Sequence, residues 1–139
     1  MNEQEQFNKK LEEIRKDLLI EVSQWWGHKY SGYKGTIITN SKEVYEYQYY
    51  HIAPESLDDE SRYIRKTKSI DDEEFQKICK FIEDEIMNKQ FQGKSIMDAG
   101  YNVIVNYSGC KKEIKNNKGD GNNIEIFDIA QELINKIIK

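Results

Sequence analysis

Cysteine and proline are both scarce in this chain of 139 residues, which contains two cysteines and one proline. Small secreted domains that depend on disulfides normally carry more cysteines, so a disulfide framework is not expected. The first ten residues are polar and charged, and the longest apolar runs span only a few residues. Neither a signal peptide nor a membrane span is therefore expected, and the expected location is the cytoplasm.

An excess of basic residues is also missing. The chain has 25 acidic and 21 basic residues, a net charge of -4 and a pI near 5.3. Nucleic-acid binders need basic surface to neutralise phosphates, so no nucleic-acid partner is expected. A mildly acidic balance instead favours solubility and attraction to basic protein partners.

Groups of metal ligands with local spacing are absent from the sequence. His28, His51, Cys79 and Cys110 are each more than 20 residues from the next. Structural zinc sites take their ligands in pairs a few residues apart. The sequence therefore predicts no zinc site, and Cys79 is expected to be a buried apolar residue of a helix.

The polar loop 116–123 has the composition of a calcium loop but not its ligands. With Gly121 as the sixth residue of such a loop, Lys118 occupies the third position and Phe127 the twelfth. A calcium loop needs an acidic or amide side chain at the third position and a bidentate glutamate at the twelfth. The glycines also match no phosphate-binding or dinucleotide-binding pattern. No metal and no cofactor are expected.

Catalytic motifs are missing as well. No nucleophile elbow or activated cysteine is recognisable, and the adjacent carboxylates at 58–59, 71–72 and 83–85 lie in polar surroundings. A general acid needs a carboxyl group whose pKa is raised by burial, which these surroundings do not favour. The sequence therefore favours a binding protein over an enzyme.

What the chain does contain is a pattern that occurs twice, with two extended segments around a tight turn followed by an amphipathic helix. The first copy is Gly35 to Ile52 with Ser69 to Gln90, and the second is Tyr101 to Lys115 with Asn122 to Lys139. A single hairpin is marginally stable in water, and a single helix cannot bury its apolar stripe. Both hairpins are therefore expected in one sheet that the helices cover.

Two further helical signals mark the first and second helices. Apolar residues recur at spacings of three and four from Phe7 to Trp25, which predicts one helix capped by Asn2 and ended by Gly27. Asp71 and Glu74 form the capping-box pattern at the start of the second helix.

Residues 44–52 alternate as in a strand. Tyr45, Tyr47, Tyr49 and His51 fall on one side, and Val44, Glu46, Gln48, Tyr50 and Ile52 on the other. The tyrosine side is expected to face the core, because rings at a period of two form a continuous apolar surface. Residues 62–67 are compatible with a short edge strand or with an ordered loop, and both interpretations stay open.

Together these patterns predict a single α+β domain over residues 1–139. Its expected form is a two-layer sandwich of three helices on a mainly antiparallel sheet of about four or five strands, built from two hairpins. The expected order is α-β-β-(β)-α-β-β-α.

The functional prediction depends on surface chemistry. The candidate partner-binding residues are three aromatic residues near Gly27 and four acidic residues after the only proline, namely Trp26, Tyr30, Tyr33, Glu55, Asp58, Asp59 and Glu60. Aromatic residues are enriched at binding hot spots, and acidic surfaces attract basic partners. The first hypothesis is a small soluble non-enzymatic protein that neutralises or inhibits a protein partner, as immunity proteins and antitoxins do. The alternative is a small-molecule-binding or catalytic domain with a pocket between sheet and helices, and a homodimer is a further possibility.

Overall fold

The computed structural model describes residues 2–27, 31–51, 61–87, 99–117 and 121–138. Within them it contains one antiparallel sheet of six strands and three α-helices, which confirms the predicted α+β class. In chain order the elements are α1 (Glu3–Arg15), β1 (Leu18–Trp26), β2 (Gly32–Thr39), β3 (Glu43–Tyr50), β4 (Arg62–Ser69), α2 (Asp72–Phe81) with its π-helical extension η2 (Ile82–Met87), β5 (Ala99–Tyr107), β6 (Cys110–Asn117) and α3 (Gly121–Ile138).

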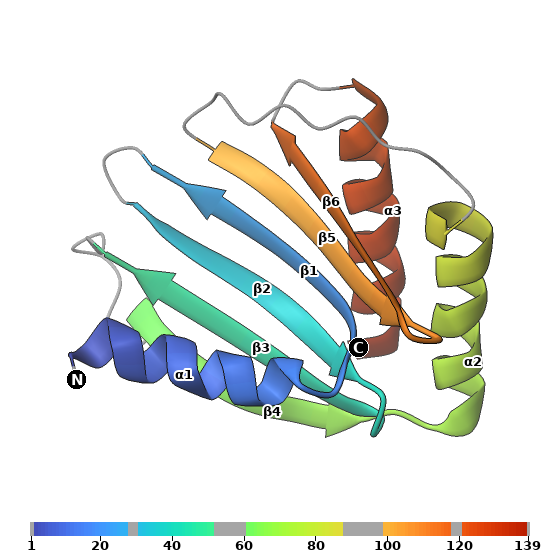
Figure 1. Cartoon of the computed structure of the whole chain (residues 1–139), viewed down its shortest axis with the longest axis horizontal. Coiled ribbons are helices and arrows are strands. Elements are labelled where there is room, and N and C mark those ends of the chain that lie inside the picture. The colour runs from blue at the N-terminus through green and yellow to red at the C-terminus, as the bar shows by residue number, and fades with distance from the viewer. Residues whose placement is uncertain (1, 28–30, 52–60, 88–98, 118–120, 139) are drawn as a thin grey trace.

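The strands lie in the order β4-β3-β2-β1-β5-β6, and every neighbouring pair is antiparallel. The earliest strand, β1, is in the middle and joins the sheet segment β2–β3–β4 to the hairpin β5–β6 (Figure 1). The predicted hairpins are therefore both present in one sheet, but a strand that the sequence did not indicate connects them.

That strand replaces the second half of the helix predicted from Phe7 to Trp25, so this prediction is wrong beyond Arg15. Leu18, Leu19, Ile20 and Val22 are all buried, because β1 has neighbours on both sides and helices over both faces. Such a strand is apolar at consecutive positions and does not alternate. Its apolar residues therefore also satisfy a spacing of three or four, which imitates a helical stripe.

Helices cover both faces of the sheet, so the molecule has three layers and the predicted two-layer sandwich is wrong. On one face Phe7 and Leu11 of α1 pack with Leu18, Ile37, Tyr47 and Tyr49. The other face packs against α2, η2 and α3 and forms the larger apolar core, which includes Ile78, Ile82, Ile86, Ala130 and Ile134. Figure 1 shows α1 on one side of the sheet and the other two helices on the opposite side.

Because helices cover both faces of the sheet, both sides of the strand at residues 44–52 face apolar core. Tyr47 and Tyr49 are buried beneath α1, as predicted for the tyrosine side. Val44 points to the other face and is fully buried there as well. Both faces of β3 thus contribute to a core, the one through Val44 near its start and the other through Tyr47 and Tyr49 further along.

The strands β4 and β6 form the two edges of the sheet, and β4 shows that residues 62–67 belong to an edge strand. This is the optional strand of the predicted order, so only β1 raises the strand count to six, above the four or five predicted. Exposed basic residues occur on both edges, including Arg65 and Lys66 on β4 and Lys111 on β6. Charged side chains at an edge discourage pairing with strands of other molecules.

The start of α2 has the predicted capping box. The Asp71 side chain accepts a hydrogen bond of 2.8 Å from the Glu74 backbone N–H, and the Glu74 side chain accepts one of 3.2 Å from the Asp71 backbone N–H. Asp72 pairs with Lys42, and Glu74 lies 3.9 Å from Lys68. The acidic residues of this segment therefore cap the helix and connect it to the sheet.

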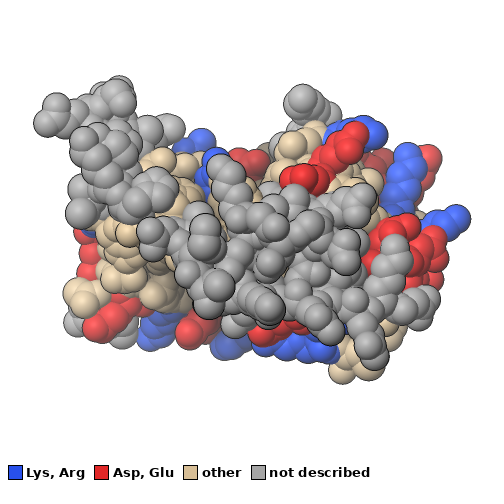
Figure 2. Space-filling view, turned by 90° about the horizontal axis from the view of Figure 1, so that it is seen from above, with Lys and Arg blue, Asp and Glu red and all other residues tan. Residues whose placement is uncertain are grey.

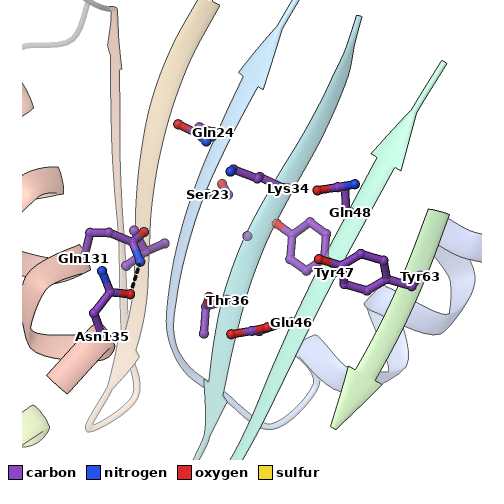
Figure 3. Close-up of a pocket in the computed structure, with 12 residues that line it drawn as sticks. Ser23, Gln24, Lys34, Thr36, Glu46, Tyr47, Gln48, Tyr63, Gln131 and Asn135 are labelled. Carbon is purple, nitrogen blue, oxygen red and sulfur yellow. Dashed lines mark hydrogen bonds between the residues drawn. The ribbon is translucent and has the colours of Figure 1, made fainter. Parts of the chain in front are cut away.

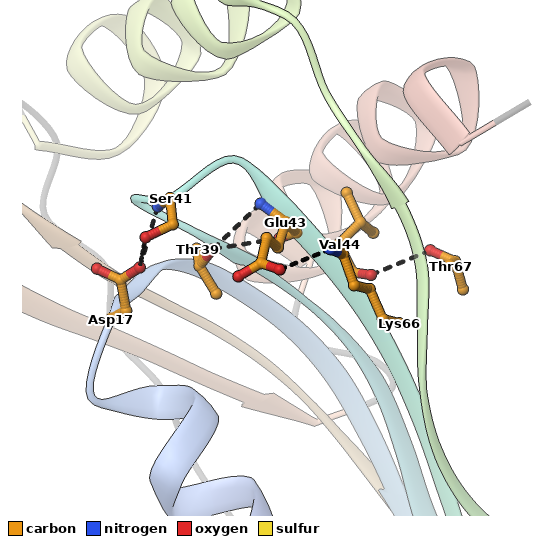
Figure 4. A network of polar contacts seen from close by, with 7 residues as sticks. All are labelled: Asp17, Thr39, Ser41, Glu43, Val44, Lys66 and Thr67. Carbon is orange, nitrogen blue, oxygen red and sulfur yellow. Dashed lines mark hydrogen bonds and ion pairs between the residues drawn. The ribbon is translucent and has the colours of Figure 1, made fainter.

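The turn between β2 and β3 is tied to the α1–β1 connection and to β4 (Figure 4). The Asp17 carboxylate accepts hydrogen bonds from the Ser41 backbone N–H at 3.0 Å and from the Ser41 hydroxyl at 2.5 Å. Glu43 at the start of β3 pairs with Lys66 of β4 at 2.7 Å. These contacts connect the turn to the α1–β1 segment and the start of β3 to β4.

A buried ionic cluster fastens α1 to the sheet. The Glu21 side chain of β1 is 1% exposed and accepts two hydrogen bonds of 2.7 Å from the Arg15 guanidinium. The Tyr47 hydroxyl of β3 also donates to Glu21. The hydrogen bonds to Glu21 raise the pKa of Arg15 above its usual range, while burial, followed by the Glu21 charge, raises the pKa of Tyr47 above its usual value.

The raised pKa of Tyr47 predicts a loss of stability at alkaline pH. Because the unfolded chain releases this proton at a lower pH than the folded chain does, deprotonation favours unfolding as the pH rises above about 10. Below that pH, the protonated Tyr47 makes its full contribution to the unfolding free energy. We expect the unfolding free energy, measured by urea denaturation, to fall by up to about 1.4 kcal/mol per pH unit above it.

Tyr47→Phe should reduce that slope, although Tyr33, whose pKa is also raised by burial, will leave a remainder. An equally steep decline in wild type and variant would show that Tyr47 does not titrate in this way.

Candidate functional site

One region of the sheet surface is hollowed and polar. On the face that carries α2 and α3, a groove of about 400 Å³ lies over β1, β2 and β3, beside α3 (Figure 3). We call it the sheet groove. Its polar and aromatic side chains are Gln24, Lys34, Thr36, Glu46, Gln48 and Tyr63 from the sheet and Gln131 and Asn135 from α3. Small-molecule sites in proteins commonly have volumes in this range, but most of them are more apolar.

Strand alternation and register bring these side chains to one face. Lys34 and Thr36 alternate on β2, and Glu46 and Gln48 alternate on β3. The register pairs Lys34 with Gln48 and Thr36 with Glu46. Because successive side chains of a strand point to opposite faces, all four share the face of the groove.

The polar character of the floor changes along the strands. Towards α2, the same face presents Ile20, Ile38 and Val44, all buried in the larger core. Further along, one cross-strand row contains Val22, Thr36, Glu46 and Arg65, and the row after that contains Gln24, Lys34, Gln48 and Tyr63. The apolar core thus gives way to a polar surface where the helices no longer cover the strands.

The two charged groups of the sheet groove are available to a ligand. Lys34 is exposed and Glu46 is half-buried. Nearby Glu43 and Lys66 pair with each other, whereas neither Lys34 nor Glu46 has an ion-pair partner among the residues that the structure describes. A ligand could therefore bind each charge without breaking an existing ion pair.

The opposite face supports the floor of the groove from below. Gly35 is the cross-strand partner of both Ser23 and Tyr47, and a Cβ atom on Gly35 would lie 2.5 Å from the Tyr47 hydroxyl oxygen. The Tyr47 ring therefore lies over the glycine and reaches Glu21. This packing beneath α1 holds β1, β2 and β3 in place under the groove.

The α3 wall is polar as well. Gln131 donates a hydrogen bond of 3.0 Å to Asn135, one turn further along the helix, and Figure 3 shows both side chains beside the sheet. Asp128, Glu132 and Lys136 line a neighbouring depression on the same helix. The side of α3 next to the groove therefore offers amide groups close to the sheet and charged groups farther out.

Charges of both signs are interspersed on the described part of the face seen in Figure 2. No group of three or more histidine, cysteine, aspartate or glutamate side chains within the described residues is arranged to hold a metal ion. None of the described helices has the length and apolar character needed to cross a membrane.

The candidate residues chosen from the sequence do not form one described site. Trp26 is half-buried, and its ring packs edge-on against Tyr50 with centroids 5.2 Å apart. Tyr33 belongs to the cluster beneath α1, where its ring stacks on Tyr49 at 5.4 Å and its hydroxyl donates to Asn8. By strand alternation Trp26 and Tyr33 lie on opposite faces of the sheet. Tyr30, Glu55, Asp58, Asp59 and Glu60 lie outside the described residues.

None of the sheet-groove residues is among the candidates predicted from the sequence, although one signal pointed to them. The first extended segment is predicted to begin at Gly35, whereas β2 begins at Gly32 and so includes Lys34. Glu46 and Gln48 fall on the side of their strand opposite the tyrosines, which is not the side predicted to face the core. A tight turn centred on Ser41 pairs Lys34 with Gln48 and Thr36 with Glu46. The position of this turn in the sequence is therefore enough to predict that these four polar side chains lie together.

No family model, curated protein or solved structure matches this chain. The functional argument therefore rests on the chemistry of the described residues.

Proposed function

We propose that this chain is a small non-enzymatic binding protein and that the sheet groove is its binding site for a polar small molecule. The observation that carries the proposal is the pair of charges, Lys34 and Glu46, that lack ion-pair partners among the described residues and face a hollow of about 400 Å³. Oriented polar groups on a rigid sheet can fix a ligand in one orientation.

The chemistry of the groove supports binding over catalysis. Its lining contains no histidine or cysteine among the described residues, and the hydroxyl groups on its face belong to Thr36 and Tyr63. A nucleophilic hydroxyl needs a neighbouring base within hydrogen-bond reach. Thr36 is 7% exposed and opposite Glu46, but none of the hydrogen bonds found joins the two side chains. The carboxylate is therefore better suited to holding a ligand than to activating Thr36.

A groove-filling variant tests this proposal. Gln24→Trp places an indole on the groove floor, and Lys111→Trp, at an exposed position on β6, is the matched control. In a thermal-shift screen against polar metabolites, we expect at least one compound to stabilise the wild type and the control. A ligand at a hundred times its Kd stabilises the native state by about 2.7 kcal/mol.

The same compound should leave the melting temperature of Gln24→Trp nearly unchanged. A stabilisation of equal size in this variant would place the site elsewhere, and the proposal would then fail.

The second candidate is a protein partner, the first hypothesis drawn from the sequence. It is favoured by Trp26 and Tyr50, which lie one row beyond Lys34 on the face of the sheet groove. An aromatic pair beside a polar groove could anchor a larger surface. Recovery of one protein by wild type and Lys111→Trp, but not by Trp26→Ala, would favour this candidate. Unchanged recovery by Trp26→Ala would argue against the aromatic pair as the anchor.

A further inference from the structure

One row of the sheet groove has the chemistry of a carboxylate subsite. Lys34 lies between Gln24 and Gln48, its cross-strand partners on β1 and β3. Figure 3 shows the three side chains in one line across the strands. An ammonium group donates hydrogen bonds and carries a positive charge, and each glutamine amide adds two N–H donors. Together they match an anionic group with several acceptor atoms.

The next row has the opposite preference. Glu46 lies between Thr36 of β2, which is 7% exposed at the bottom of the groove, and Arg65 of β4. The Arg65 guanidinium lies over the Tyr63 ring, 4.0 Å from its centroid. A carboxylate only accepts hydrogen bonds, and a hydroxyl can accept them as well, so this row suits a cationic donor. The two rows are separated by two residues, or roughly 7 Å along the strands. The long side chains of Lys34 and Glu46 can reach over part of that distance.

We propose that the sheet groove recognises a small zwitterion, a free amino acid or a short peptide with free ends. Its carboxylate lies against Lys34 and the two glutamines, and its ammonium group lies against Glu46 and Thr36. The inference rests on the proposed function, because it assigns the ligand class to the same groove. Val22 and the amides of Gln131 and Asn135 then face the remainder of the ligand.

Ligands with other charges fit these two rows less well. A simple anion bound at Lys34 would be repelled by the nearby Glu46 carboxylate. A simple cation bound at Glu46 would be repelled by the nearby Lys34 ammonium group. A neutral sugar could bind the amides but would leave Lys34 without a counter-charge. Only a ligand with one charge of each sign matches both rows at once.

Matched probes test the charge requirement by isothermal titration calorimetry. The common amino acids and the dipeptide Ala-Ala are titrated first, which separates single residues from peptides. The best probe is then compared with its N-acetylated form, its C-terminal amide and glucose. We expect saturable binding of the zwitterion, at least a tenfold loss of affinity on blocking either end, and no binding of glucose.

Charge-reversal variants supply the sharper test, because they predict a gain as well as a loss. Glu46→Lys gives the groove two cations and should bind succinate in place of the zwitterion. Lys34→Glu gives it two carboxylates and should bind 1,4-diaminobutane. Lys77→Gln on the exposed side of α2 is the control and should bind the zwitterion as the wild type does. Circular dichroism and a melting curve show whether each variant is folded.

The possible results separate this inference from the proposed function. Equal binding of the blocked and free probes, unchanged binding after both charge reversals, or no saturable binding of any zwitterion overturns the inference. In any of these cases, a different metabolite that stabilises the wild type but not Gln24→Trp leaves the groove as the binding site. If Gln24→Trp binds the zwitterion as the wild type does, both proposals fail.

Discussion

Arg15→Met is expected to lower the unfolding free energy by about 3–5 kcal/mol. The Glu21 carboxylate is 1% exposed, and Arg15 supplies two of its hydrogen bonds, both 2.7 Å long. Without Arg15, the Tyr47 hydroxyl is the only hydrogen-bond donor left to the buried charge among the residues that the structure describes. Methionine keeps much of the apolar contact of the arginine stem, so the measured loss reports mainly on the unpaired charge.

Two further variants separate charge from packing in this cluster. In Arg15→Met/Glu21→Gln, the buried charge is removed while an amide oxygen still accepts from Tyr47, so more than half of the lost stability should return. Lys16→Met removes an exposed lysine, whose side chain is 72% exposed and paired with Glu13, and should change stability by less than about 0.5 kcal/mol. Urea denaturation measures all three. A loss below about 1 kcal/mol for Arg15→Met would contradict the account of the cluster.

Gly35→Ala is expected to cost about 2–4 kcal/mol, because the added methyl group has no space. It would lie 2.5 Å from the Tyr47 hydroxyl oxygen, 2.7 Å from its Cζ atom and 2.8 Å from the Ser23 Cβ atom. Tyr47 cannot easily move aside, since its hydroxyl is bonded to the buried Glu21. The variant must therefore either strain the ring or lose that hydrogen bond.

A double-mutant cycle identifies the cause. In a Tyr47→Leu background the ring and hydroxyl are gone, so the additional cost of Gly35→Ala should fall to about half or less. Ser23 still limits the space, which is why some cost should remain. Equal costs in the two backgrounds would show that the ring is not what requires a glycine at this position.

The parts of the fold that the sequence predicted correctly are those specified by local chemistry. Asp71 and Glu74 marked the start of α2, because a capping box satisfies backbone N–H groups within a few residues. The tight turn predicted within Tyr101 to Lys115 lies at Ser108 and Gly109, and both residues have the positive φ angles that such turns use. Neither signal depends on what the rest of the chain does.

The wrong predictions depended on contacts between distant segments. The apolar residues of β1 could follow a helical or a strand pattern, and only the double burial by α1 on one face and by α2 and α3 on the other decides between them. The same burial makes three layers where two were expected. Glu21 shows the difficulty best, because the 1% exposure of this carboxylate depends on Arg15 of α1 and Tyr47 of β3.

The proposed binding site was hidden for a related reason. Lys34 and Glu46 are unremarkable in the sequence, and they become a candidate site only because β2 and β3 pair in one register and the helices leave that part of the sheet uncovered. The residues favoured from composition, such as Trp26 and Tyr33, are instead separated by the sheet.

Nuclear magnetic resonance of the isotopically labelled protein tests most directly whether the sheet groove is the binding site. The low-molecular-mass fraction of a cell lysate is titrated into the wild type and into Gln24→Trp. The account predicts saturable shifts for Gln24, Lys34, Glu46 and Gln48 in the wild type, absent from the variant, while residues of α1 stay unchanged. Shifts centred on α1 or shared equally by the variant would contradict it, as would the absence of any saturable shift.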